Sequence, residues 1–106
     1  MGYELVALAL ATTPPELRKE HPRALIVLVT MAAYARDTDS DDQPAGVYFA
    51  GWGPLAISLG YTWPAELETG GPGRRSVYRQ LDILTAYGVV KRDGRARYRL
   101  TFGLMP

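Results

Sequence analysis

Basic side chains are concentrated in one short stretch near the C-terminal end of the 106-residue chain. The sequence "KRDGRARYR", residues 91–99, places five basic side chains in nine positions, although the formal net charge of the chain is only +1. Guanidinium groups suit phosphate recognition because each is permanently charged and offers several donors in one plane. The stretch therefore suggests a polyanionic partner, with a solvated basic surface as the alternative.

The charge of the chain is divided by position. Residues 1–72 carry four basic and nine acidic side chains, whereas residues 73–106 carry eight basic and two acidic ones. Their formal net charges are therefore −5 and +6. A separation of this size creates a local positive potential that the total charge conceals, and it favours a polyanion. Charge alone does not distinguish a surface that binds a polyanion from a solvated one. The arrangement of the side chains has to decide between them.

Catalytic and cysteine-based sites are disfavoured by the residue types present. The chain has no cysteine, which excludes disulfides, thiolate metal sites and a cysteine nucleophile. The single histidine, His21, lies between Glu20 and Pro22 and has no evident set of serine, cysteine or metal-ligand partners. We therefore predict a protein that is not an enzyme and has no cofactor, no metal and no small-molecule substrate.

Two other motifs resemble ligand-binding loops only in part. The stretch "DTDSDDQPAG", residues 37–46, starts like a calcium loop, but Asp42 stands where glycine is needed and Tyr48 where glutamate is needed. The stretch "GGPGRRS" lacks the lysine and the spacing of a phosphate-binding loop. We predict a solvated acidic loop at the first and a flexible lead into a helix at the second.

Composition and apolar runs predict one globular domain over residues 1–106. The longest central apolar run, "ALIVLVTMAAYA", covers 12 residues, whereas a membrane-spanning helix needs about 20. The apolar stretch "LVALALATT" follows a glutamate and runs into "PPELRKE", which is unlike an export signal. We expect a cytoplasmic protein that does not contact a membrane.

The proline and glycine residues divide the chain into expected elements. Residues 12–22 contain three prolines and predict only a short helical turn, and the apolar run that follows predicts a central helix over residues 23–36. "VYFAG" predicts a short strand able to pair with strands elsewhere. "GPLAISLGY" predicts a helix over about residues 54–60 that has Leu55 and Leu59 on one side and ends at Gly60.

The strongest helix prediction covers about residues 74–87. Val77, Leu81 and Leu84 share one face at helical spacing, flanked by Ile83 and Tyr87, so this face belongs to the core. Another side carries Arg74, Arg75, Tyr78, Arg79 and Asp82, and Gly88 follows as a stop. The arginines gather at the end that carries the positive half of the helix dipole, which is unfavourable for stability. A bound anion would relieve this conflict.

A β-hairpin is predicted over about residues 89–102, because "VVKRDGRARYRLTF" has two β-rich runs around Asp93-Gly94. A two-residue turn there places Arg92 opposite Arg95. Ala96, Tyr98, Leu100 and Phe102 then share one face with Val89 and Lys91, and Arg95, Arg97 and Arg99 share the other with Val90 and Arg92. Opposed arginines are destabilising unless an anion neutralises them. Protection of a strand edge by charge is the alternative reason for so many arginines.

In this order of elements the sequence resembles the winged helix-turn-helix family. The resemblance rests on "PLAISLGY" as the first motif helix, "RRSVYRQLDILTAYGVV" as the recognition helix with its exit, and "KRDGRARYRL" as the wing. It covers residues 23–102 and is greatest with small domains of actinobacterial and phage regulators and replication initiators. Two departures stand out. "TWPAELETGGPG" inserts about a dozen residues, with Glu66 and Glu68, where the motif turn has three or four, and Gly73 stands where a serine or threonine cap is usual.

The resemblance implies an α+β winged helix-turn-helix fold that binds specific double-stranded DNA, as a transcriptional regulator or a replication-initiation component. It implies that Arg75 and Arg79 read guanine in the major groove and that Arg74, Ser76 and Tyr78 hold phosphates. The wing contact then comes from four basic residues, Lys91, Arg92, Arg95 and Arg97. A protein-interaction module with this fold is the alternative, favoured by the acidic insertion and the apolar central helix. A homodimer formed through "MGYELVALALATT" is left open.

Overall fold

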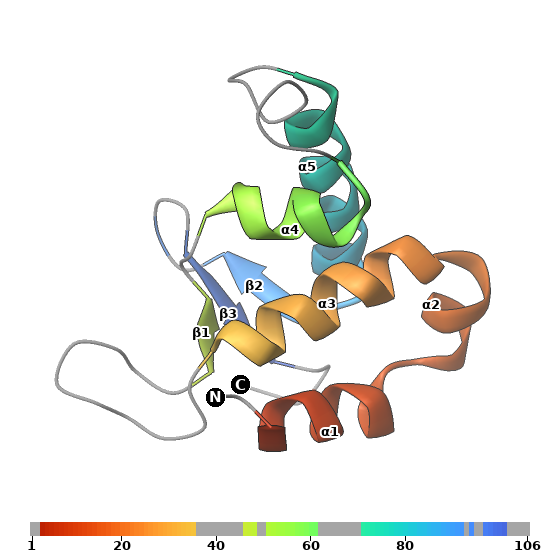
Figure 1. Cartoon of the computed structure of the whole chain (residues 1–106). Coiled ribbons are helices and arrows are strands. Elements are labelled where there is room, and N and C mark those ends of the chain that lie inside the picture. Colours follow the sequence, from red (N-terminus) through yellow and green to blue (C-terminus); the bar gives the residue numbers. More distant parts are fainter. Residues whose placement is uncertain are drawn as a thin grey trace, which may run out of the picture.

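A computed structural model describes residues 3–35, 46–48, 51–61, 71–92, 94 and 97–101, with no account of the side chains of residues 3–5. The predicted class is confirmed, since these residues form an α+β structure that is mostly helical and has one small antiparallel sheet (Figure 1). The helices are α1 (Tyr3–Thr12), α2 (Pro15–Glu20), α3 (Pro22–Tyr34), α4 (Trp52–Ser58) and α5 (Pro72–Ala86). The strands are β1 (Val47–Tyr48), β2 (Val90–Arg92) and β3 (Tyr98–Leu100).

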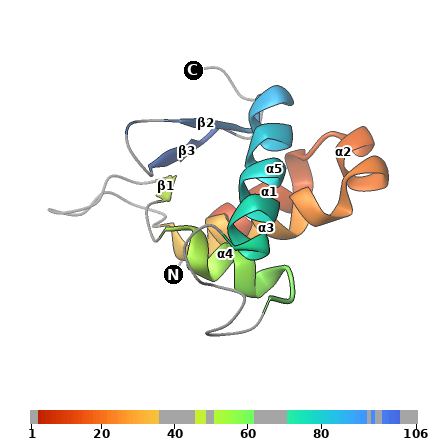
Figure 2. The same ribbon diagram turned by 90° about the horizontal axis from the view of Figure 1, so that it is seen from above.

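Helix α3 lies at the centre of the fold, as its sequence predicts. It packs against α1, α2, α4, α5 and β1 (Figures 1 and 2). Pro22 occupies the first turn, where the missing N–H costs no helical hydrogen bond. Ala24, Val27, Leu28, Met31 and Ala32 are buried. Burial is incomplete, because Ile26 and Tyr34 remain exposed.

The N-terminal segment forms a helix that the sequence analysis did not predict. Helix α1 packs against α3, and Ala9 is completely buried. Val6 and Leu8 are half-buried against the same core, whereas Leu10 is exposed. Apolar residues that were considered for a dimer interface therefore serve in part to cover α3. The short helical turn predicted between the prolines is α2, whose Leu17 is buried.

The two helices predicted at about residues 54–60 and 74–87 are present with shifted boundaries. Helix α4 begins and ends two residues before the predicted range of 54–60; Leu55 is buried, Leu59 caps the helix, and Gly60 has a φ of +97°. Helix α5 begins at Pro72, so the residue at its N-cap is Gly71. The assignment of Gly73 to the cap is wrong. Proline favours the first position of a helix, so α5 begins at Pro72, one residue before Gly73. Gly73 is instead buried within the first turn.

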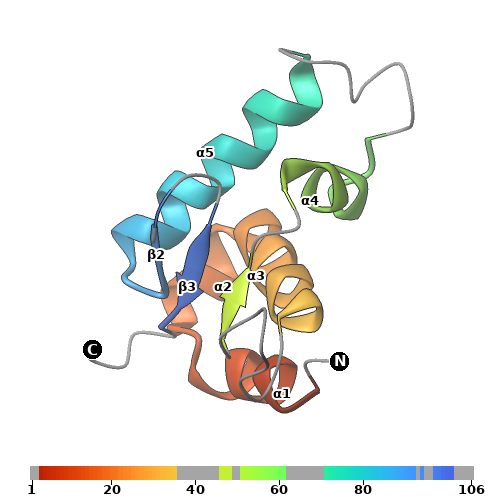
Figure 3. The ribbon, with the colours of Figure 1, turned by 90° about the vertical axis from the view of Figure 1, so that its left-hand side faces the viewer.

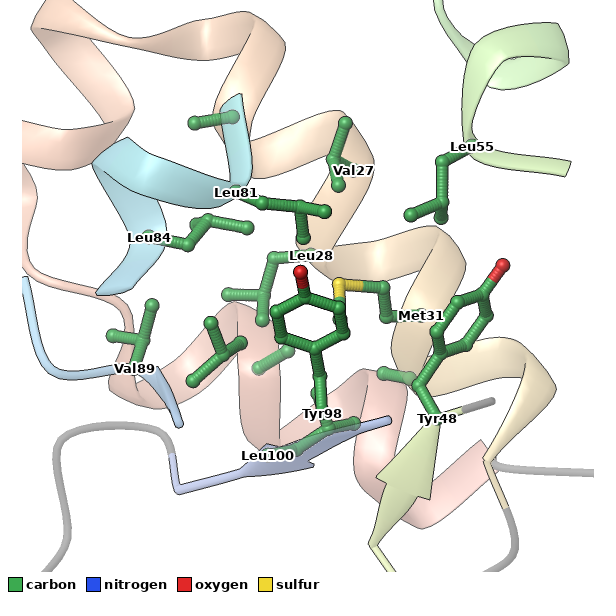
Figure 4. Close-up of a cluster of buried hydrophobic side chains, with 14 of the residues drawn as sticks. Val27, Leu28, Met31, Tyr48, Leu55, Leu81, Leu84, Val89, Tyr98 and Leu100 are labelled. Carbon is green, nitrogen blue, oxygen red and sulfur yellow. The ribbon is translucent and has the colours of Figure 1, made fainter. Parts of the chain in front are cut away.

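The buried face of α5 matches the prediction from its apolar spacing. Val77, Leu81 and Leu84 are buried, and the helix ends before Gly88, whose φ is +75°. The backbone N–H of Val89 then donates to the carbonyl of Leu84 at 3.2 Å, which satisfies a carbonyl at the helix end. Figure 4 shows Leu81 and Leu84 meeting Leu28 and Met31 of α3 and side chains of β3 in one cluster.

The three strands form an antiparallel sheet in the order β1-β3-β2. The strand predicted at "VYFAG" is confirmed for Val47–Tyr48 as β1, which pairs Val47 with Arg99 and Tyr48 with Tyr98, whereas Phe49 and Ala50 lie outside the described residues. In the hairpin, Val90 pairs with Leu100, Lys91 with Arg99 and Arg92 with Tyr98. The predicted pairing of Arg92 with Arg95 is therefore wrong, and so is the two-residue turn.

The observed register reverses the prediction of which β2 side chains share a face with Tyr98 and Leu100 of β3. Arg92 lies opposite Tyr98 instead of Arg95, a shift of three residues, and any odd shift moves a strand's inward side chains to the other face. Val90 therefore shares the buried face with Tyr98 and Leu100, and Lys91 points outward with Arg99. Burial of Val90 outweighs the local preference of Asp93-Gly94 for a tight turn, since a buried valine contributes about 1.5–3 kcal/mol. Asp93, Arg95, Ala96 and Phe102 lie outside the described residues.

Candidate nucleic-acid interface

The exposed side of α5 carries a ridge of two arginines. An α-helix turns by about 100° per residue, so Arg75 and Arg79 lie within about 40° of each other around the axis. Both side chains are exposed, and the core face with Val77 and Leu81 lies on the other side of the helix. By the same geometry Tyr78 and Ser76 lie about 60° to either side of this pair. We call Arg75 and Arg79 the arginine ridge.

One flank of the arginine ridge is an open hollow lined by Arg74, Arg75, Tyr78, Arg79 and Asp82. The guanidinium carbon of Arg74 lies 5.6 Å from the centre of the Tyr78 ring. A cation over an aromatic face at this distance is attracted to it, which favours one orientation of both side chains. These are the residues that helical spacing in the sequence places together on one side of α5. Asp82 is the acidic member of the hollow, one turn further along the helix.

The other flank of the ridge is a hollow lined by residues of three segments. Arg23 comes from α3, Tyr61 follows α4, and α5 contributes Pro72, Arg75, Ser76, Arg79 and Gln80. Arg23 Nη2 donates to Ser76 Oγ at 3.3 Å. Ser76, predicted to hold a phosphate together with Arg74 and Tyr78, is half-buried beside a guanidinium from another helix. Because Arg75 and Arg79 line both hollows, they form the boundary between them.

The N-cap and first turn of α5 contain no side chain that offsets the helix dipole. The N-cap is Gly71, which offers no side-chain acceptor, and no acidic residue lies in the first turn. Its first N–H groups therefore add partial positive charge to that of Arg74 and Arg75. This local excess is the conflict predicted from the sequence, and a phosphate near the helix start would reduce it.

The hairpin supplies a second basic group. Lys91, Arg92 and Arg97 are exposed, and Arg92 Nε lies 3.4 Å from the carbonyl oxygen of Gly94 as a donor. Arg95, the fourth predicted wing residue, lies outside the described residues. Arg99 is exposed opposite Lys91 on the outer face. Arg99 was predicted to share a face with Arg95 and Arg97 but was not among the predicted site residues.

Tyr98 connects the hairpin to α5. Burial raises the pKa of the Tyr98 phenol, the nearby charge of Arg92 lowers it, and Tyr78 and Asp82 raise it. The pairing of Tyr98 with Arg92 and the hollow that it shares with Tyr78 place the phenol near groups of both the hairpin and α5. Tyr78 and Tyr98 also line a small apolar hollow between α4, α5 and the sheet, together with Tyr48, Trp52, Leu55 and Leu81. Figure 3 shows the hairpin strands beside the C-terminal half of α5.

Two residues of this surface were missed by the sequence analysis for different reasons. Arg99 was visible in the basic stretch, and the register of the hairpin decides its position. Arg23 is separated from Ser76 by 53 residues. No periodicity or motif links the start of α3 to the start of α5, so only the tertiary packing of α3 against α5 reveals the contact.

Other kinds of site find little support within the described part of the chain. His21 packs edge to face against Tyr87, with ring centres 5.8 Å apart, at the end of α5 away from the arginine ridge. The described residues hold no group of three or more histidine, cysteine, aspartate or glutamate side chains placed for a metal ion. None of the described helices combines the length and the apolar character needed to cross a membrane.

Comparison with known proteins gives no further guide to this surface. No protein-family model, curated protein or solved structure matches the chain.

Proposed function

We propose that the chain is a winged helix-turn-helix protein that binds specific double-stranded DNA, as a transcriptional regulator or a replication-initiation component. The observation that carries this proposal is the arginine ridge, which stands on the solvent side of a helix whose other side is core. The order of elements adds support. Helix α4, helix α5, Gly88 and the β2-β3 hairpin follow one another as the motif helices, exit glycine and wing of the family do.

The arginine ridge suits the major groove of B-DNA. That groove is about 12 Å wide and admits one helix, and guanine presents its O6 and N7 atoms there as a pair of acceptors. Arg75 and Arg79 each offer a planar fork of donors that matches this pair. They are exposed and lie about one turn apart, so they reach successive positions along the groove floor.

Phosphate contacts come from the flank and from the hairpin in this proposal. Arg74, held over Tyr78, lies in the hollow beside the ridge, where it can contact a phosphate of the groove wall. The hairpin carries exposed Lys91 on its outer face, exposed Arg92 opposite Tyr98, and exposed Arg97, and Arg95 adds a further charge in the sequence between Arg92 and Arg97. Such contacts position the protein and make binding sensitive to salt, but they carry little sequence information.

A protein-interaction module with the same fold is the second candidate. Exposed large apolar side chains favour it, namely Leu10, Ile26, Tyr34 and Ile57. They are spread over α1, α3 and α4, outside the two hollows of the arginine ridge. A two-fold homodimer on a pseudo-palindromic site stays a prediction that light scattering can measure.

Binding to DNA as a function of salt tests the proposal. A site is first selected from a random duplex pool, and affinity is then measured for the selected duplex and for a scrambled one. Log affinity should fall with log salt at a slope of about 0.9 for each phosphate neutralised. The double variant Arg75→Ala/Arg79→Ala should lose the preference for the selected duplex.

The matched control is Arg18→Ala/Lys19→Ala, which removes the same charge from exposed positions of α2 that line neither hollow. It should keep the preference for the selected duplex. A folded wild-type protein that binds no duplex at about 50 mM salt, where phosphate contacts are strong, would contradict the proposal and favour the interaction module.

A further inference from the structure

We infer that Arg23 of α3 is a phosphate-binding residue, and that it contacts the DNA strand opposite to the one held by the hairpin. This inference rests on the proposed function. It starts from the hollow that Arg23 shares with Arg75, Ser76, Arg79 and Gln80 on the side of α5 away from the hairpin. Basic residues therefore lie on both sides of the arginine ridge.

The position of Arg23 is defined by one hydrogen bond and by the start of its helix. Its Nη2 donates to Ser76 Oγ at 3.3 Å, which uses one of the five N–H donors of a guanidinium. The side chain is exposed, so a phosphate that enters the hollow can reach its other donors. Arg23 also lies in the first turn of α3, which has no acidic residue to offset the helix dipole.

The two hollows lie on opposite flanks of the ridge. Around the axis of α5, Tyr78 lies about 60° to one side of Arg75, and Ser76 lies about 60° to the other side of Arg79. The Tyr78 side faces Tyr98 of the hairpin, because both tyrosines line the same apolar hollow. The Ser76 side faces Arg23. The hairpin and Arg23 therefore stand on opposite sides of the helix.

A helix in the major groove has one phosphate backbone along each of its sides, because the two strands form the two walls of that groove. The hairpin side of α5 then faces one strand, and Arg23 faces the other. In this arrangement Ser76 is a positioning residue, because its hydroxyl holds the guanidinium of Arg23 at the start of α5. This positioning role replaces the direct phosphate contact that the family resemblance implies for Ser76.

The first test compares Arg23→Ala with Arg18→Ala, which removes the same charge from an exposed position of α2 that lines neither hollow. Loss of a charged hydrogen bond to phosphate should weaken binding to the selected and the scrambled duplex by about tenfold each. The salt slope should fall by about 0.9. Arg18→Ala should leave both quantities near the wild-type values.

Two further variants separate charge from local structure. Arg23→Gln keeps an amide donor for Ser76 and removes the charge, so it should reproduce the reduced salt slope of Arg23→Ala. Ser76→Ala keeps the charge and removes the hydrogen bond, so it should lower affinity by a smaller factor and leave the salt slope nearly unchanged. Both variants alter partly or fully exposed side chains, and thermal unfolding confirms that each protein is folded.

The second test assigns the strand. Single phosphates of the selected duplex are replaced by neutral methylphosphonates, one position at a time on each strand. For the wild type, each replacement at a contacted phosphate should weaken binding. With Arg23→Ala one position should lose this sensitivity, and with Arg97→Ala the insensitive position should lie on the other strand.

The outcomes distinguish this inference from the proposed function. A wild-type protein that binds no duplex overturns both. A wild-type protein that binds DNA, with Arg23→Ala indistinguishable from Arg18→Ala, overturns the role of Arg23 alone. Insensitive positions on the same strand for Arg23→Ala and Arg97→Ala overturn the two-strand arrangement.

Discussion

Helix α5 and the β2-β3 hairpin are both basic and were predicted with very different success. The faces of α5 are as the sequence indicates, with Val77 and Leu81 buried and Arg75 and Arg79 exposed. The faces of the hairpin are exchanged relative to the prediction, since Val90 is buried and Lys91 is exposed. The two regions therefore differ in how far local sequence determines which side chains meet solvent.

The reason lies in the hydrogen bonding of each element. Every helical hydrogen bond joins residues four apart, so the faces of α5 depend only on its own spacing and survive a shift of its ends by two residues. A hairpin joins residues across a turn, and its faces depend on the length of that turn. With Arg92 paired to Tyr98, residues 93–97 lie between the last paired positions.

The largest expected effect concerns how much a buried leucine of each region contributes to the free energy of unfolding. Leu84 of α5 is completely buried, and Leu100 of β3 retains 7% exposure. Leu84→Ala should lower the free energy of unfolding by about 3–5 kcal/mol, and Leu100→Ala by about 2–3 kcal/mol, because a site near the surface collapses more easily around a cavity. Urea denaturation of the two variants measures this. Equal losses would show that the hairpin is as firmly part of the core as the helix.

The fold was more predictable than the site. Apolar spacing located α3, α4 and α5, because each buries a stripe set by its own sequence. The N-terminal helix α1 was missed because its apolar residues have no clear periodicity. Arg23 was missed because its contact with Ser76 joins two helix starts that only tertiary packing brings together. Register and long-range contacts are therefore the information that local patterns lack.

The second prediction compares how the two regions contribute to binding. Arg79→Ala should cost about 1–3 kcal/mol on the selected duplex and much less on a scrambled one, because a base contact is specific to its partner. Arg95→Ala/Arg97→Ala should weaken both duplexes by similar factors and lower the salt slope by about one for each lost contact. Fluorescence anisotropy at several salt concentrations measures both. Wing variants that change the sequence preference, with Arg79→Ala lowering every affinity equally, would reverse the proposed roles of helix and hairpin.

The third prediction tests the hairpin register itself. Val90 is buried against Leu100, so Val90→Ala should destabilise the protein by about 1–2 kcal/mol. The neighbouring variant Lys91→Ala should change stability by less than about 0.5 kcal/mol, because the side chain is exposed. Thermal unfolding distinguishes them. The register with Arg92 opposite Arg95 requires the reverse order, since it places Lys91 on the side of Leu100.

The smallest effect concerns the like charges that the corrected register brings together. Lys91 lies opposite Arg99 on the outer face, so the electrostatic cost first assigned to Arg92 and Arg95 belongs to this pair. Lys91→Glu creates an opposite-charge pair and should raise the free energy of unfolding by about 0.2–1 kcal/mol at low salt. Lys91→Gln is the control and should give about half of this gain. Both gains should shrink at about 1 M salt, where screening is strong. The same Lys91→Glu variant should weaken DNA binding, because it removes a wing cation from the proposed interface. A gain in stability that does not depend on salt would show that the pairing of Lys91 with Arg99 is not its cause.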